Sequence, residues 1–509
     1  MIEDITEAVS RPSHPADVIV IGSGIAGFEV ASTLVKSGRR VILLESGRRD
    51  FDERIQAQNE LIFAAKAHRE QSPEAPYHRY LPSHLRGVSR LRQLGGTSNL
   101  WTGKWKHMQA SDFDARSWVP NSGWPIEFED LLPHYRSTAI DYNLGDLEAE
   151  AERQELDQLR TAIAPAGLKL TSFFWEETPT RTASRLLTGI GQDPNLHVVL
   201  GATVTALNSI SPPQTDKKRI HEVVAQGPED QTLRVSGSNV VLATGAIETA
   251  RLLLASGQTQ AEQLGNATGL VGRFYTDHLK HHEGYLEPGP LTQKYAAELQ
   301  YGPKPRFCIC FALDDATQSG YQLLEHVLYL KPEYSQGFFQ AMRNRITAGH
   351  PTRDQNGWVM RYKVKFVSEH VPHLNSRVYL SRERDCFGQY KPVLDWNFTD
   401  IEPIAVTKAA QLCVERFAQA GLGRLDFGST PVTIDGCTDA AHQMGTTRMG
   451  LTPQDGVVDT NCRVFGTENL FIASSAVFPS CPSYSPTFTI LALARRLAVH
   501  LTTQSASAP

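Results

Sequence analysis

The alternation of apolar and polar residues is clearest near the start of the chain. An apolar run over 18–21 is followed by glycines, then by apolar residues near helical spacing, and then by a second apolar run over 41–44 that ends at Glu45. A stretch with a 3.6-residue period between two short apolar runs is typical of a helix that connects two parallel strands. The segment 17–47 therefore predicts a βαβ unit.

The hydrophobic pattern changes along the rest of the chain. Between about 280 and 400, apolar and polar residues alternate in RFCICFAL, HVLYL, WVMRYKVKFV and SRVYLS, which is typical of an antiparallel sheet. After about 426 the pattern again predicts strands, turns and helices. NLFIAS is expected to form a strand, and residues 486–501 are expected to form an amphipathic helix. Other segments also predict regular structure: a strand over 198–208, a strand, glycine turn and helix over 239–255, a helix over 401–420 and a charged surface helix over 146–160.

Composition narrows the class of protein. The chain has 509 residues, of which 41% are hydrophobic and 21% charged, and its net charge is -5. This length suits two or three hydrophobic cores, and the charge gives no reason to expect nucleic acid or an anionic membrane as a partner. No apolar run approaches the ~20 residues of a membrane span, and the acidic N-terminus lacks an apolar signal segment. We therefore expect a cytoplasmic protein.

The spacing of cysteine and histidine does not favour a metal site. The seven cysteines are odd in number and form no CxxC pair, so they predict neither a disulfide framework nor a zinc knuckle. The stretch DHLKHHEG (277–284) gathers histidines and acids, but it lacks an HExxH motif, and only His278 and His282 have i,i+4 spacing. We expect no bound metal.

The motif GSGIAG follows the first predicted strand. Gly22, Gly24 and Gly27 suit a tight turn, a close approach of backbone to a pyrophosphate, and close packing of helix on strand. The N-terminus of the helix then offers free N–H groups to phosphate, and Glu45 is placed to hold ribose hydroxyls. An acid at this position argues against a 2′-phosphate, but it leaves NAD and FAD open.

Three further stretches have residue types that suit chemistry. LRQLGGTSNLWTGKW (91–105) suits either a loop along a cofactor ring or a surface loop, and VVLATGAIETARLLLAS (240–256) suits either a close approach to a cofactor or an ordinary strand–helix turn. In DAAHQMGTTRMG (439–450), His442 precedes a glycine–threonine turn. A neutral imidazole is the side chain best suited to take a proton near pH 7, although a lone histidine is more often structural.

Taken together, the stretches resemble the glucose–methanol–choline (GMC) oxidoreductase family. Their order matches: GSGIAG…LLESG, LGGTSNLWTG, LATGAIETARLLLAS, and HQMGTTRMG…GVVDTNCRVFGTENLFIASSAVFPS before a final helix. GLVGRFYTDH (269–278) and SRVYLSRERDCFGQYKPVLDW (376–396) fit as well. The motifs GGTSNLWTG and HQMGTTRMG are most similar to those of the bacterial sugar- and alcohol-oxidising branch.

The resemblance implies the fold and the reaction. It implies an α/β fold (α+β overall), in which a Rossmann-like FAD-binding domain is built from discontinuous segments and a substrate domain with a mainly antiparallel sheet is inserted. Applied to this chain, the FAD-binding domain covers 1–278, with insertions at about 50–190, and resumes over 426–509, while 279–425 form the substrate domain. The implied reaction transfers a hydroxyl proton to a histidine and a hydride to flavin N5, and the electrons then pass to oxygen or another acceptor.

The resemblance also implies roles for single residues. His442 matches the family's active-site histidine and is expected to act as general base. The residues implied to contact FAD are Gly22, Ser23, Gly24, Gly27, Glu45, Ser46, Gly95, Gly96, Thr97, Ser98, Asn99, Trp101, Val204, Ala243, Thr244, Gly245, Ser475, Ala476, Pro486 and Thr487. Because the loop TSNLW (97–101) lacks the histidine through which some relatives attach FAD, we expect non-covalent FAD.

The stretch SYSPTFTIL (483–491) departs from the family pattern. The family usually has histidine or asparagine at the position of Ser485. A serine hydroxyl can donate one hydrogen bond but cannot become a cation. One hypothesis is that His442 alone is the base and that Ser485, or its neighbour Tyr484, orients the substrate. Alternatively, Ser485 is only a helix cap. Serine at the N-cap and proline in the first helical position are both favoured, so this role is also consistent with the sequence.

The leading prediction is an FAD-dependent oxidoreductase acting on the CH–OH group of a sugar, glycoside or other alcohol. Because of Ser485, a second prediction is a flavoenzyme of the same fold that desaturates or isomerises a natural-product intermediate. A third is a flavin subunit that delivers electrons to a partner protein, which would be a separate chain because no CxxCH haem motif is present.

Overall fold

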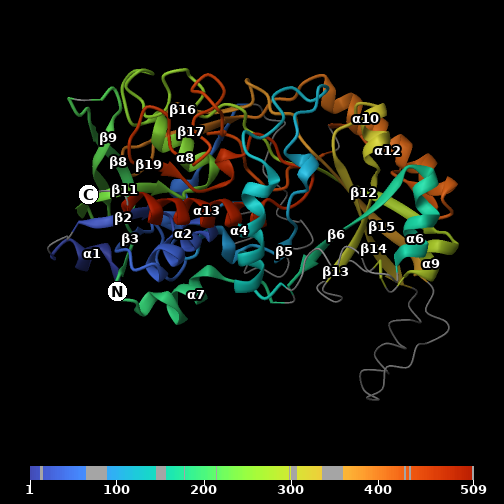
Figure 1. Cartoon of the computed structure of the whole chain (residues 1–509), viewed down its shortest axis with the longest axis horizontal. Coiled ribbons are helices and arrows are strands. Elements are labelled where there is room, and N and C mark those ends of the chain that lie inside the picture. Colours follow the sequence, from blue (N-terminus) through green and yellow to red (C-terminus); the bar gives the residue numbers. More distant parts are fainter. Residues whose placement is uncertain are drawn as a thin grey trace, which may run out of the picture.

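The computed structural model describes residues 1–11, 15–64, 89–144, 156–176, 178–213, 215–296, 298–299, 307–334, 359–428, 432–434 and 437–506. At one end of an elongated molecule lies a six-stranded parallel sheet, and at the other end lies a seven-stranded antiparallel sheet (Figure 1). This arrangement agrees with the predicted α/β fold with a second, mainly antiparallel sheet.

The parallel sheet contains the predicted βαβ unit. Its strands, in spatial order, are β1 (Ile2–Asp4), β7 (Leu196–Leu200), β3 (Val41–Leu44), β2 (Ala16–Ile21), β11 (Gly237–Leu242) and β19 (Leu470–Ile472). The two central strands β2 and β3 are buried almost throughout, as expected where both faces of a parallel sheet are covered. The helix α2 (Ile25–Lys36) connects them, so the prediction from the apolar pattern is confirmed.

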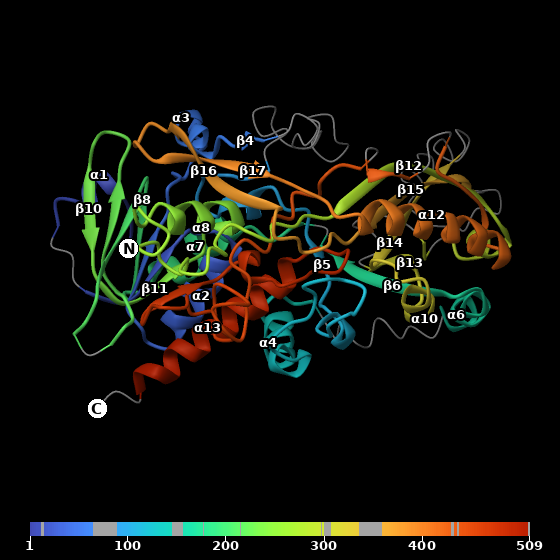
Figure 2. The same ribbon diagram turned by 90° about the horizontal axis from the view of Figure 1, so that it is seen from above.

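Helices from distant parts of the chain cover this sheet. The long C-terminal helix α13 (Thr487–Ala506) packs beside α2, and α4 (Phe128–Asp141) packs against α13 (Figure 2). The helix α8 (Gly245–Leu254) follows β11 and packs against the small sheet of β16 (Arg377–Arg384), β17 (Tyr390–Asp395) and β4 (Ile62–Phe63). The C-terminal segment therefore returns to the N-terminal unit, as the strand–turn–helix pattern after 426 predicts.

The antiparallel sheet forms the far end of the molecule. Its strands, in spatial order, are β18 (Gly423–Asp426), β12 (Leu279–Pro288), β15 (Val359–Ser368), β14 (His326–Tyr334), β13 (Phe307–Leu313), β6 (Leu168–Trp175) and β5 (Lys104–Trp105). The helices around it are α6 (Asp157–Ile163), α9 (Pro290–Lys294), α10 (Asp315–Gly320) and α12 (Ile401–Gln419). Two of the strands, β5 and β6, come from the segment predicted as an insertion of the FAD-binding domain, so the domain boundaries stay a prediction.

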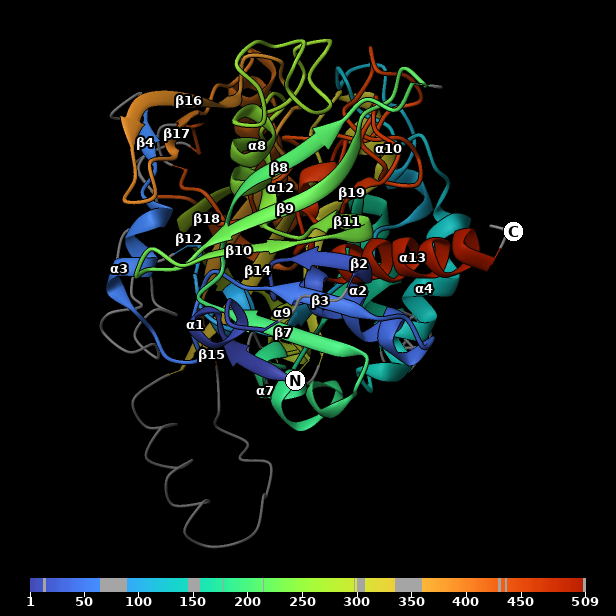
Figure 3. The ribbon, with the colours of Figure 1, turned by 90° about the vertical axis from the view of Figure 1, so that its left-hand side faces the viewer.

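A three-stranded antiparallel sheet extends the parallel unit. It consists of β8 (Thr203–Ile210), β9 (Arg219–Gln226) and β10 (Thr232–Val235), and Figure 3 shows it next to the parallel sheet. The prediction of one strand over 198–208 is wrong. The chain turns at Gly201, whose φ of 68° lies in the left-handed region, so that β7 ends and β8 begins on either side of it.

The other predicted helices are found where the described residues cover them. The helix predicted over 401–420 is α12, and the helix predicted over 486–501 is α13. The predicted surface helix over 146–160 lies largely outside the described residues. The described helix nearest to it in the sequence is α6. Three shorter helices complete the parallel unit: α1 (Ile5–Ala8), α3 (Glu53–Gln56) and α7 (Thr182–Thr188). In the part of the chain that the structure describes, no helix has the length and apolar character of a membrane span.

Candidate active site

A cavity of about 1320 Å³ lies where the two large sheets and the C-terminal segment meet. The turn at Gly22 and the strand end at Glu45 line it from the parallel unit, Lys363 lines it from the antiparallel sheet, and His442 and Ser485 line it from the C-terminal segment. The volume exceeds the 300–1,000 Å³ of an ordinary small-molecule site. It therefore has room for a dinucleotide together with a second ligand.

The glycine turn between β2 and α2 is built as a cradle. A Cβ on Gly27 would lie 1.9 Å from the Gly22 carbonyl oxygen, so only glycine allows the helix to pack this closely on the strand. By contrast, a Cβ on Gly24 would meet no atom within 4 Å, because Gly24 faces the cavity. The first turn of α2 is thus open to a phosphate group, with its N–H groups and positive dipole end exposed to the cavity.

Glu45 holds the glycine turn from the end of β3. Its Oε2 accepts hydrogen bonds from the Ser23 N–H at 2.9 Å and from Ser23 Oγ at 2.6 Å, and its Oε1 accepts one from the Gly47 N–H at 2.7 Å. Oε1 also accepts a longer hydrogen bond from Ser46 Oγ at 3.3 Å. Both lone pairs of Oε2 are thus used, and a ribose hydroxyl would replace the weakly held Ser46 hydroxyl on Oε1. Glu45 lines the cavity, in the position that the sequence predicts for a ribose-binding acid.

The loop over 95–99 is fastened above the glycine turn. The Gly95 N–H donates to Ser23 Oγ at 2.8 Å, and Ser98 Oγ donates to the Gly95 carbonyl at 2.7 Å. The Asn99 side chain donates to the Leu94 carbonyl at 2.9 Å. This loop is therefore part of the cavity wall, and the interpretation as a free surface loop is wrong.

Most residues implied to contact FAD do line the cavity: Gly22, Gly24, Glu45, Ser46, Gly96, Thr97, Ser98, Trp101, Val204, Ala243, Thr244, Gly245, Ser475, Pro486 and Thr487. Ser23, Gly27, Gly95, Asn99 and Ala476 are not among the lining residues. They lie behind the wall and position it, as the Ser23 and Asn99 hydrogen bonds show. These residues fit a dinucleotide such as FAD.

His442 reaches the cavity through a pairing of two distant segments. Isolated antiparallel bridges join Thr276 to Met444 and Lys280 to Thr438. Between them, the Asp277 carboxylate accepts hydrogen bonds from the N–H groups of Ala440 and His442, each at 3.0 Å. The chain thus holds the histidine by its backbone and leaves the ring to the cavity.

The backbone just before this histidine is strained. Ala441 has a φ of 56°, which is uncommon for a residue with a Cβ, and its N–H donates to Asp439 Oδ1 at 2.8 Å. Strained residues of this kind cluster at functional sites, where the surrounding structure holds them in place. The turn at Ala441 and its hydrogen bond therefore fix the backbone just before His442.

His278 lies directly beside His442. The two Nδ1 atoms are 2.9 Å apart, and the ring planes meet at 85°. Burial lowers the pKa of His278 to about 3. Burial, the neighbouring His278 and the charges of Lys280 and Lys104 lower the pKa of His442 well below its ordinary value. Both rings are therefore neutral at pH 7, and one hydrogen is shared between the facing nitrogens.

Ser485 lines the cavity just before α13. Its Oγ lies 3.1 Å from Thr487 Oγ1, and the helix itself begins at Thr487. The first helical hydrogen bond runs from the Ile490 N–H to the Pro486 carbonyl, so Pro486, and not Ser485, occupies the cap position. The N-cap interpretation of Ser485 is wrong for this reason.

Tyr484, the other predicted orienting residue, does not line the cavity. Its side chain is buried, and its hydroxyl donates to the Asp112 carboxylate. The preceding Ser483 N–H donates to Glu325 Oε2 at 2.7 Å. These two contacts fix the loop that carries Ser485, so of the two predicted candidates only Ser485 faces the cavity.

A buried ion cluster forms another part of the wall. Glu248 on α8 accepts hydrogen bonds from Arg92 at 2.7 Å, from Arg251 at 2.9 Å and from Arg90 at 3.1 Å. Although burial alone would raise it, the arginines lower the pKa of Glu248 to about 2. Arg92 Nε also donates to Asn59 Oδ1 at 2.8 Å.

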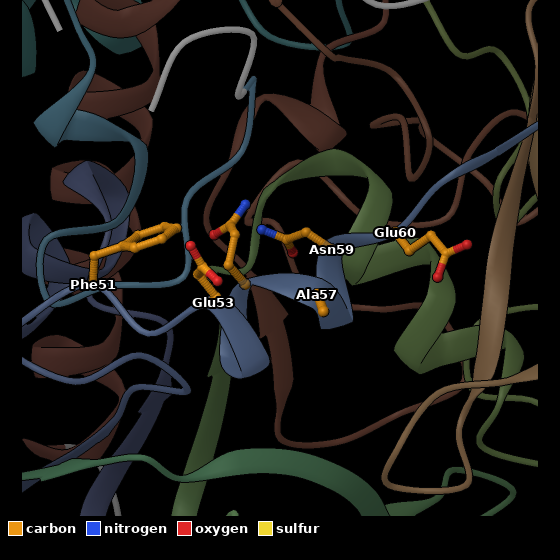
Figure 4. A pocket seen from close by; sticks show the side chains of 6 residues that line it. Phe51, Glu53, Ala57, Asn59 and Glu60 are labelled. Carbon is orange, nitrogen blue, oxygen red and sulfur yellow. The ribbon is translucent and has the colours of Figure 1, made fainter. Parts of the chain in front are cut away.

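Asn59 also lines a second, more open pocket of about 490 Å³. Figure 4 shows this pocket, with Phe51 on one side and Glu60 on the other. Its lining residues are Phe51, Glu53, Gln56, Ala57, Asn59 and Glu60. The segment that carries Asn59 thus joins the ion cluster to the molecular surface.

Sequence reasoning missed His278 and the ion cluster. YTDH was part of the family resemblance, but nothing in the sequence places His278 against a residue 164 positions away. The spacing of Glu248 and Arg251, three residues apart on α8, is a signal for an ion pair, whereas Arg90 and Arg92 come from a distant loop.

The fold combines a Rossmann-type parallel unit with an added antiparallel sheet, and a large cavity lies between them. Residues 372–494 match the family model described as GMC oxidoreductase. This segment toward the C-terminal end of the chain is thus similar to GMC oxidoreductases, and the resemblance predicted from the motifs is confirmed.

Relatives of known activity match nearly the whole chain. The fructose dehydrogenase large subunit of Gluconobacter japonicus is 24% identical over 96% of this chain and 98% of its own length. The paromamine 6'-oxidase of Streptomyces fradiae is 24% identical over 95% of this chain and 90% of its own length. These relatives are oxidoreductases that act on sugars and alcohols, in agreement with the predicted enzyme class.

Solved structures share the fold. Pyridoxine 4-oxidase from Mesorbium loti superposes with a TM-score of 0.61 at 19% identity, and the match covers 96% of this chain and 99% of that one. Formate oxidase from Aspergillus oryzae RIB40, in a structure that concerns FAD modification, has a TM-score of 0.58 at 17% identity, with 97% and 100% covered. The two-sheet architecture is thus shared with these two solved structures.

Proposed function

We propose that this chain is an FAD-dependent oxidoreductase that oxidises the CH–OH group of a sugar, glycoside or other alcohol. The observation that carries the proposal is the position of His442. Its neutral ring lines a cavity that the glycine turn at Gly22 also lines. A base that faces the same cavity as a dinucleotide cradle is the arrangement needed to take a hydroxyl proton while a hydride leaves the same carbon.

Different residues of the cradle would bind different parts of the cofactor. The open N-terminus of α2 at Gly24 would hold the pyrophosphate, Glu45 the ribose and Val204 the adenine edge. The loop at Thr97 and the segment at Ser475 would enclose the flavin ring. When bound there, FAD would supply the hydride acceptor at its N5.

His442 and His278 are proposed to act as a pair. When the shared hydrogen is on His442 Nδ1, the His442 Nε2 has a free lone pair and can take the proton of a substrate hydroxyl. His278 then accepts the hydrogen bond and holds the ring of His442 in that tautomer. His278 is thus a positioning residue, and its low pKa keeps it neutral so that it can accept.

We propose that the reduced flavin passes its electrons to oxygen or to another acceptor. One of the relatives is the large subunit of a fructose dehydrogenase, which favours a partner protein as a second candidate for the acceptor. Measurements of oxygen uptake and of dye reduction by the reduced protein distinguish an oxidase from a dehydrogenase.

The proposal is tested by anaerobic addition of a panel of sugars and alcohols to the purified yellow protein. We expect one or more members to bleach the flavin absorbance, with one carbonyl formed for each flavin reduced. A protein that binds no flavin would contradict the proposal.

We expect FAD to be released by acid. The loop TSNLW holds no histidine, and the described wall of the cavity holds only His442, which is assigned to proton transfer. No second histidine of the described wall is therefore placed to attach FAD. Precipitation with trichloroacetic acid should leave the yellow colour in the supernatant. Colour that stays with the precipitated protein would show a covalent bond.

Ser485→Ala is expected to slow flavin reduction by about tenfold. A neutral hydrogen bond contributes about 0.5–1.5 kcal/mol, and Ser485 is the hydroxyl that replaces the family's histidine or asparagine. Stopped-flow reduction under anaerobic conditions measures this rate. The matched control is Ser238→Ala, which removes an exposed hydroxyl on β11. A full rate in Ser485→Ala would leave Ser485 with no part in the reaction.

A further inference from the structure

One face of the antiparallel sheet carries a group of lysines toward the cavity. Lys104 on β5, Lys280 on β12, Lys331 on β14, and Lys363 and Lys365 on β15 all belong to the cavity lining. We call this set the lysine face. Strand alternation explains how it forms, because residues two apart on one strand point to the same side, as Lys363 and Lys365 do.

The register of the strands sets two of these lysines against each other. Lys331 on β14 lies directly opposite Lys363 on β15, and Tyr329 lies opposite Lys365. Like charges in directly opposite positions destabilise a sheet. Within the described part of the chain, no carboxylate forms an ion pair with Lys331 or Lys363. Lys331 is exposed and Lys363 is half-buried, and an anion bound between them would relieve this repulsion.

The acidic residue that the described part of this face contributes to the cavity, Glu333, is already engaged. Glu333, two residues after Lys331 on β14, lines the cavity, but its Oε2 accepts a hydrogen bond from Arg361 Nε at 2.6 Å. Lys104 lies against aromatic rings, with its Nζ 4.7 Å from the centre of Trp175. On this side of the cavity, Lys331 and Lys363 therefore carry positive charge that no carboxylate of the described residues pairs with.

The positive charge extends to the reaction centre. Lys280 and Lys104 are both close enough to His442 to lower its pKa, and Lys280 also lowers the pKa of His278. The lysine face thus adjoins the proposed base. It belongs to a different sheet from the cofactor cradle, whose residues Gly22, Glu45 and Val204 come from the parallel unit and its extension. The charge therefore lies on the substrate side of the cavity.

We propose that the alcohol oxidised here is itself an anion, a sugar or polyol that carries a phosphate or carboxylate group. This inference rests on the proposed function. Lys331 and Lys363 flank the anionic group from opposite strands, Lys365 supports it, and the CH–OH to be oxidised extends toward His442. Lysine suits this role because a flexible ammonium is a point charge that can adapt to a phosphate or a carboxylate.

The test measures binding to the FAD-loaded protein by isothermal titration. Glucose is compared with glucose 6-phosphate and with glucuronate, so that the charged group is the only major change and its two sources are separated. We expect at least tenfold tighter binding of one or both anions than of glucose, and a loss of that advantage as ionic strength rises. Equal affinity for glucose and both anions would overturn the inference.

Variants assign the binding to the lysine face. K331Q and K363Q, alone and combined, should lower the affinity for the anion, by at least tenfold in the double variant, with an unchanged flavin spectrum as evidence of a folded cofactor site. The matched control K217Q removes an exposed lysine outside the cavity and should bind like the parent. Unchanged anion binding in the double variant would also overturn the inference.

Different results would overturn the proposed oxidation and the proposed anionic substrate. If anions bind through the lysine face but no alcohol, charged or neutral, bleaches the flavin, the proposed oxidation fails and the anion site stands. If neutral alcohols bleach the flavin and the lysine variants react at the parent's rate, the oxidation stands and the anionic substrate is overturned.

Discussion

Replacing His442 with alanine should slow anaerobic reduction of the flavin by about 10²–10⁴-fold, the range that a general base contributes. The reason is positional, because the side chain lines the cavity and its pKa is held well below the ordinary value, so it is unprotonated and ready to accept at pH 7. Stopped-flow measurement of flavin bleaching by a substrate gives the rate directly.

Two comparisons separate chemistry from folding in this experiment. The control His221→Gln changes an exposed histidine on β9, outside the cavity, and should reduce at the parent's rate. The His442→Ala protein should keep the FAD spectrum of the parent, because the cradle at Gly22 and Glu45 is untouched. A variant that holds FAD and still reduces at full rate would remove His442 from the mechanism.

Glu248→Gln should destabilise the parallel unit by about 3 kcal/mol at pH 7. The pKa of Glu248 is lowered from 4.5 to about 2, and each unit corresponds to about 1.4 kcal/mol of stability for the ionised state. The change also leaves Arg90, Arg92 and Arg251 without their shared carboxylate, and breaking a buried pair in this way is costly. Urea unfolding followed by fluorescence measures the difference.

The contribution of Glu248 to the free energy of unfolding should fall as the pH is lowered. Because the folded pKa lies below the unfolded one, the contribution of Glu248 is fully present above about pH 4.5 and is lost as the pH falls toward 2. The gap between parent and variant should therefore close in that window. The control Glu287→Gln breaks an exposed pair with Arg424 and should change the unfolding free energy far less. A gap that is constant from pH 7 to pH 2 would contradict the assigned role.

Local sequence pattern was sufficient wherever neighbouring residues determine the structure. The unit β2–α2–β3 follows from two apolar runs and a helical period, and the close approach of Gly27 to Gly22 is the packing that the glycine motif predicts. Three of the four alternating stretches likewise became strands of the antiparallel sheet, whereas SRVYLS became β16 of the small sheet beside α8. The strand predicted over 198–208 failed because a single glycine, Gly201, takes a left-handed conformation that its neighbours do not reveal.

Contacts between distant segments could not be predicted in the same way. His278 meets His442 only because Thr276 bridges to Met444 in a particular register, which no local pattern encodes. The alternation in WVMRYKVKFV does place Lys363 and Lys365 on one side of a strand. It does not say that this side faces the cavity, which depends on how the two sheets are arranged.

The central claim is that this cavity converts a CH–OH group into a carbonyl. The most direct measurement is a single anaerobic turnover of the FAD-loaded protein with an alcohol that bleaches its flavin, labelled with ¹³C at the carbinol carbon and followed by NMR. The account predicts one labelled carbonyl for each flavin reduced. A product that keeps its hydroxyl and gains a carbon–carbon double bond would contradict it.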